Sequence, residues 1–283
     1  MRNLRLALLG LAAMSALLLG LGFLQRAFKS DNAPPATATA PEAPAAPAAE
    51  SAVNPPPLPF AVKDARQKIE TIIATAPEYG RFFDRLRLLF PNNYNGILDS
   101  LAKDAVTAQK PPAADALLAD AVTALRRANG SFAAKAPDAA LAQIFAMQLK
   151  EMQALAQRDA HLCVAFLFGT NGSGLLDFAA SHRDLVADAA ISGLEAMNSG
   201  RISPTQRGMP GDADFQTLDK ALTDKGLSRA EIETLLDGKT ADPPIPDERM
   251  CAAGQIYLET LRGLDPAARG RLYSLAVDLM VKS

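Results

Sequence analysis

The chain has 283 residues, of which 49% are hydrophobic and 21% are charged, and this composition is typical of a globular protein. The formal net charge is −2, and short basic clusters such as Arg126-Arg127 do not form the basic face that binding to phosphates requires. We therefore expect no nucleic-acid partner. Only 6% of the residues are aromatic, while alanine and unbranched side chains are abundant, which favours an all-α fold.

The N-terminal segment has the pattern of a membrane anchor. Arg2 and Arg5 precede an uncharged run of 19 residues that begins at Leu6 and ends at Leu24. This run is longer than the apolar part of a signal peptide, about 7–15 residues, and can cross a bilayer as a helix. We therefore interpret residues 1–30 as an uncleaved single-pass anchor with a cytoplasmic N-terminus. The alternative is a signal peptide whose cleavage releases a secreted protein.

Residues 31–59 form the next unit, which carries nine of the 20 prolines of the chain. Alanine fills half of the remaining positions, and no large apolar cluster is present. Such a composition predicts a disordered Pro/Ala-rich linker that extends by about 3.1 Å per residue. By analogy with other tethered proteins, we place the anchor in a bacterial inner membrane and the following domain, residues 60–283, in the periplasm.

The first half of this domain shows the 3.6-residue periodicity of amphipathic helices. Prolines separate the predicted helices, since proline cannot continue a helix from within it. We expect helices over residues 60–76, 82–90, 92–108, 111–130 and from near residue 137. The buried stripe of the last is predicted to contain Leu141, Ile144, Phe145, Gln148, Met152, Leu155 and Ala156.

The second half continues this pattern, with a helix over residues 182–200 and two closing helices over 246–264 and 265–280. Ser228 and Glu231 have the spacing of a capping box at the start of another helix. Asn129-Gly130 and Ser199-Gly200 are interpreted as helix ends, because glycine is common directly after a helix. In total we expect an irregular all-α domain of nine or ten helices and no strand pair.

The stretch HLCVAFLFGTNGSG, residues 161–174, contains one of the two cysteines of the chain. Because the periplasm is oxidising, we predict a disulfide between Cys163 and Cys251. Two buried free thiols are the first alternative. A reactive Cys163 activated by His161 or His182 is the second, although the apolar neighbours of Cys163 are expected to keep its thiol inert.

Two further kinds of site, a zinc site and a phosphate-binding loop, have little support in the sequence. His161 and Cys163 lie two positions apart and would point about 200° from each other on a helix, which disfavours a zinc site that also uses His182 and Cys251. GTNGSG lacks the lysine of a phosphate-binding loop. We therefore expect no metal and no cofactor.

Acidic residues give no catalytic pattern either. The segment around Asp212, Asp214 and Asp219 lacks the glycine and glutamate of a calcium-binding loop. The pairs Asp115/Asp120 and Glu231/Glu233 are interpreted as solvated helix faces.

No resemblance to a known family is specific enough to name. The expected role is that of a membrane-tethered interaction scaffold or adaptor, whose helical grooves hold a protein or peptide partner in the cell envelope. An envelope enzyme or small-molecule binder with a site built from scattered residues is the alternative.

Overall fold

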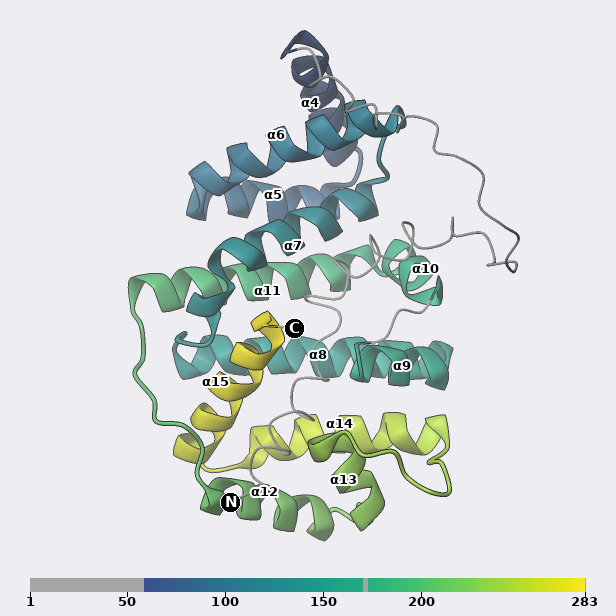
Figure 1. Ribbon diagram of the computed structural model, residues 1–283, viewed down its shortest axis with the longest axis vertical. Helices are drawn as coiled ribbons and strands as arrows, with labels where there is room; N and C mark the ends of the chain where they lie inside the picture. Colours follow the sequence, from purple (N-terminus) through teal and green to yellow (C-terminus); the bar gives the residue numbers. More distant parts are fainter. Residues whose placement is uncertain (1–58, 170–172, 283) are drawn as a thin grey trace, which may run out of the picture.

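The computed structural model describes residues 59–169 and 173–282, and this part of the chain contains twelve α-helices and no strand (Figure 1). The all-α prediction is confirmed for these residues. The predicted anchor, nearly all of the predicted linker, and residues 170–172 of the glycine-rich turn lie outside them. The helices are α4 (Pro59–Ala74), α5 (Pro77–Leu89), α6 (Pro91–Ala108), α7 (Ala114–Ala133), α8 (Asp138–Arg158), α9 (Ala160–Leu167), α10 (Ser173–Ser181), α11 (Arg183–Ile202), α12 (Asp212–Asp224), α13 (Arg229–Asp237), α14 (Asp247–Gly263) and α15 (Pro266–Lys282).

The helices stack along the long axis of the molecule (Figure 1). Helix α4 lies at one end, next to α6 and α5, while α12 and α13 lie at the other end. The order in the stack differs from the order in the chain, because α11 packs between the consecutive helices α7 and α8. Among the described helices, none is long and apolar enough to span a bilayer.

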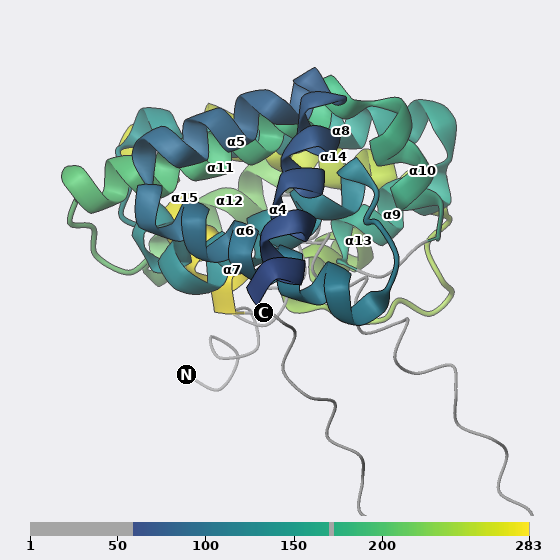
Figure 2. The same cartoon turned by 90° about the horizontal axis from the view of Figure 1, so that it is seen from above.

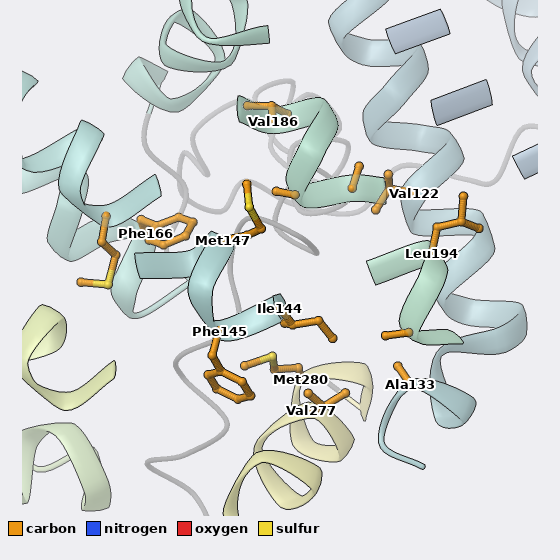
Figure 3. Close-up of a cluster of buried hydrophobic side chains, with 14 of the residues drawn as sticks. Val122, Ala133, Ile144, Phe145, Met147, Phe166, Val186, Leu194, Val277 and Met280 are labelled. Atoms are coloured by element: carbon orange, nitrogen blue, oxygen red, sulfur yellow. The ribbon is translucent and has the colours of Figure 1, made fainter. Parts of the chain in front are cut away.

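One apolar core runs through the stack, and Figure 3 shows its central part. Ile144 and Met147 of α8, Val122 of α7, Val186 of α11, and Val277 and Met280 of α15 all belong to this cluster. Phe145 stacks on Tyr273 of α15 with ring centroids 4.0 Å apart. Three non-consecutive helices thus share a single buried layer around α8.

Local sequence signals account for several helix starts. Pro77 and Pro91 occupy the first turns of α5 and α6, where a missing N–H group costs nothing. The predicted capping box of α13 is confirmed, since the Ser228 hydroxyl accepts a hydrogen bond from the Glu231 N–H (3.3 Å) and Glu231 accepts one from the Ser228 N–H (2.6 Å). The Asp265 carboxylate accepts two N–H groups at the start of α15.

Two predicted helix ends are wrong, and both were placed at a glycine. Helix α7 continues past Gly130 to Ala133, and α11 continues past Gly200 to Ile202. A Cβ atom at Gly130 would lie 2.7 Å from a Val281 methyl, and one at Gly200 would lie 1.9 Å from the Phe132 carbonyl oxygen. These glycines allow close packing between elements and do not end the helices.

The structure also has more helices than the nine or ten expected. The prediction did not separate α9, α10 and α12 as helices of their own. Asp159 divides α9 from α8, because its backbone is extended and its carboxylate caps the new helix. Helix α12 begins within the acidic segment that had been considered only as a calcium-binding loop.

Candidate functional site

The Cys163 and Cys251 sulfur atoms lie 2.04 Å apart, at disulfide distance, with their Cα atoms 5.6 Å apart. Cys163 belongs to α9 and Cys251 to α14, so the bond joins two helices that also pack against α8. Both residues are buried, with exposed fractions of 0% and 2%. In this paired form neither sulfur is available as a nucleophile.

His161 and Cys163 lie on opposite sides of α9, one at the surface and the other in the core. The Asp159 carboxylate accepts the His161 backbone N–H at 2.8 Å and thereby starts α9. The His161 side chain is 77% exposed, and its Nδ1 lies 2.8 Å from a carboxylate oxygen of Asp247. Cys163, two positions later, points into the core, as the helical geometry predicts.

His182 lies in a different environment from His161. Its ring stacks on Phe178 with centroids 4.2 Å apart, and its Nδ1 lies 3.0 Å from the Ser181 hydroxyl. Within residues 59–169 and 173–282, no group of three or more His, Cys, Asp or Glu side chains is arranged to hold a metal ion. The four residues considered for zinc are therefore not brought together as one ligand set.

The interpretation of Asp115 and Asp120 as a solvated face is wrong. Arg183 binds both carboxylate oxygens of Asp115 at 3.0 and 3.1 Å, and the Tyr79 hydroxyl donates to it at 2.6 Å. Burial acts to raise the pKa of Asp115, but these hydrogen bonds hold it below its ordinary value. Burial, followed by the charge of Asp104, raises the pKa of Asp120 to about 6. Tertiary contacts, invisible in the sequence, decide both environments.

The same correction applies to Glu231, which is 2% exposed. Besides capping α13, it forms an ion pair with Arg249 of α14. Asp214 has an equivalent role, since it binds the Arg271 guanidinium at 2.6 and 2.9 Å and so links α12 to α15. These acidic residues connect helices through ion pairs.

Glu151 is a buried acidic residue that the sequence analysis did not identify. It is 0% exposed, and neither carboxylate oxygen has a hydrogen-bond partner among the described residues. Burial raises its pKa well above the ordinary glutamate value. Its spacing from Ile144 and Met147 places it on the same face of α8 as these apolar residues. In the sequence, Glu151 can be noticed only as a charged residue that interrupts the apolar face of this helix. The sequence does not reveal that its carboxylate lacks a hydrogen-bond partner among the described residues.

A groove with a volume of about 510 Å³ lies between α4 and the end of α6. Its lining is mainly apolar, with a few charged side chains at the rim. Asp64 and Lys68 on the rim pair at 2.7 Å. The lining residues are Ala61, Asp64, Ala65, Lys68, Ile69, Ile72, Ala105, Val106, Gln109, Lys110, Pro111 and Pro112.

An unusual backbone turn shapes one wall of this α4/α6 groove. Gln109 ends α6 in the left-handed conformation with φ of 53°, which costs a non-glycine residue about 1–2 kcal/mol. The following Pro111 and Pro112 cannot extend the helix and lie along the groove. The turn thus directs the chain beside α4 and leaves the apolar side of the α6 end open.

A smaller groove of about 330 Å³ lies at the opposite end of the stack, between α12 and α13. Phe215, Ile232 and Leu236 form its apolar part. The Arg229 guanidinium lies across it and pairs with Asp219 at 2.7 Å. Because the α12/α13 groove is smaller, the α4/α6 groove is the better candidate for contact with another molecule.

We compared the chain with models of known protein families, with curated proteins and with solved structures, and none of them matches.

Proposed function

We propose that the protein is a membrane-tethered interaction scaffold, whose helical domain lies in the periplasm and contacts a protein or peptide through the α4/α6 groove. The observation that carries this proposal is the groove itself. It presents apolar side chains to solvent on the helix that directly follows the predicted linker. Apolar grooves between helices are a recurrent surface for the binding of helical or extended segments.

The compartment can be tested through the thiols of the full chain. Protein taken directly from cells is alkylated before and after reduction, and its peptides are mapped by mass spectrometry. We expect peptides containing Cys163 and Cys251 to be linked and to become alkylated only after reduction, because the periplasm maintains disulfides. Alkylation of both thiols without reduction would contradict the periplasmic location.

The groove can be tested by photo-crosslinking in cells. A benzophenone amino acid replaces Lys110, which is exposed and lines the α4/α6 groove, and a control protein carries it at Lys150, an exposed position on α8. We expect discrete adducts from position 110 that are absent from position 150. No adduct at position 110, or the same adducts at both positions, would contradict the proposed function.

A further inference from the structure

One row of side chains on α4 is complementary to itself. Phe60, Asp64, Lys68 and Ile72 follow each other at intervals of four residues, so they lie along one ridge of the helix. When two such ridges run antiparallel about a two-fold axis near position 66, each Asp64 faces Lys68 of the other copy. The same alignment places each Phe60 opposite Ile72 of the other copy.

This ridge is exposed in the part of the domain that the structure describes. The exposed fraction is 81% for the whole Phe60 residue, and 48% and 71% for the side chains of Asp64 and Lys68. Ile72 is half-buried and lines the α4/α6 groove. Along the long axis, α4 lies at the outer end of the stack, where a second molecule can approach it (Figure 2).

The opposite side of α4 contacts α6, so the ridge must point away from that contact. Arg66 lies about half a helical turn away from the middle of the ridge. Its guanidinium binds Asp99 of α6 at 2.6 Å and Asn95 at 2.9 Å. Since Arg66 holds α4 against α6, the ridge with Phe60 and Asp64 is left at the outer surface.

We propose that the occupant of the α4/α6 groove is a second copy of this chain, bound as a two-fold dimer. The Phe60 ring of each copy lies over Ile72 and the apolar groove of the other. The Asp64–Lys68 pair that each α4 forms within itself at 2.7 Å is exchanged for two Asp64–Lys68 pairs between the copies. A two-fold contact must use the same surface on both molecules, and this ridge carries both members of each pair. This inference deepens the proposed function, on which it rests, by naming the partner of the groove.

A charge-exchange experiment tests the dimer directly. The full-length protein in detergent micelles is studied by analytical ultracentrifugation as a function of concentration. We expect wild type to dimerise, and Asp64→Lys and Lys68→Asp each to weaken self-association by roughly tenfold or more, since like charges then face each other. An equal mixture of the two variants should dimerise again, because chains with two lysines then face chains with two aspartates.

Two controls separate recognition from folding. Lys63→Asp changes the charge of α4 by the same amount as Lys68→Asp but lies off the ridge, so it should dimerise as wild type does. Recovery in the mixture cannot come from a variant that has lost its fold. Wild type that stays monomeric, or single variants that dimerise as wild type does, would overturn the inference.

The crosslinking result shows whether only the dimer is wrong or whether the proposed scaffold function is wrong as well. Adducts from position 110 with the mass of two chains agree with the dimer. Adducts with a different protein, together with monomeric wild type, overturn the dimer and retain the scaffold. Neither adducts nor dimer would overturn both.

Discussion

The N-terminal end of the domain, α4 to α6, and its central layer, α8, α9, α11 and α14, are stabilised differently. The central layer has a disulfide within its core, and small residues allow its helices to approach closely. The N-terminal end has an apolar core too, but exposed ion pairs such as Arg66–Asp99 hold its surface contacts, and a groove remains open. We therefore expect substitutions in the centre to change stability most, while the surface proposed for recognition lies at the end.

The largest change in stability is expected when the disulfide is removed. Cys163→Ala with Cys251→Ala opens a loop with a sequence separation of 88 residues. The chain-entropy model predicts that the free energy of unfolding falls by about 4.6 kcal/mol, because the unfolded chain regains conformational freedom. Urea denaturation of the full chain without reductant measures this. Wild type under reducing conditions is the control and should match the variant, whereas a variant as stable as oxidised wild type would contradict the central role of the bond.

The next test acts on close packing between α11 of the central layer and the neighbouring helix α7. Gly200→Ala places a Cβ atom 1.9 Å from the Phe132 carbonyl oxygen, so α11 must move away from the end of α7. We expect a loss of about 3 kcal/mol in the free energy of unfolding. Gly96→Ala in α6 is the matched control, since a Cβ there meets nothing within 4 Å. The control should stabilise the protein by about 0.5–1 kcal/mol, and equal effects at both glycines would argue against the packing explanation.

Glu151 is expected to destabilise the central layer. Glu151→Leu should raise the free energy of unfolding at neutral pH by about 1–3 kcal/mol, because it removes a buried polar group that has no partner. The carboxyl pKa is raised in the folded state, so wild-type stability is full below the unfolded value near 4.5 and falls as the pH rises above it. The slope is at most about 1.4 kcal/mol per pH unit and ends at the folded pKa.

Denaturation series at several pH values measure this slope. Glu151→Gln cannot ionise and should remove the contribution of this residue. The control Glu259→Gln, at an exposed position on α14, should leave stability within about 0.5 kcal/mol of wild type. An unchanged slope in Glu151→Gln would show that the Glu151 carboxyl does not resist ionisation in the fold.

The smallest effect is expected where the N-terminal end meets the centre. Arg81 of α5 pairs with Asp184 and Asp188 of α11 at 3.1 and 2.9 Å, and all three side chains are exposed. Arg81→Ala should lower the free energy of unfolding by less than about 1 kcal/mol, and high salt should remove most of the difference. Thermal unfolding at low and high ionic strength checks this. A large, salt-independent loss would mean that this junction depends on packing.

The sequence determined the helical class, because alanine-rich amphipathic segments bounded by prolines and caps are local signals. The Ser228–Glu231 capping box was predicted in this way. The disulfide geometry agrees with a pairing inferred from only two cysteines and an assumed oxidising compartment. The anchor and linker remain predictions, since they lie outside the described residues.

Which helices meet, and what their side chains contact, depends on packing between distant parts of the chain. Nothing in the sequence places α11 between α7 and α8, so Gly130 and Gly200 were taken for helix ends. For the same reason the partners of Asp115 and Glu231, the isolation of Glu151 and the α4/α6 groove could not be predicted. These features depend on contacts between residues far apart in the chain, and such contacts leave no periodic pattern in the sequence.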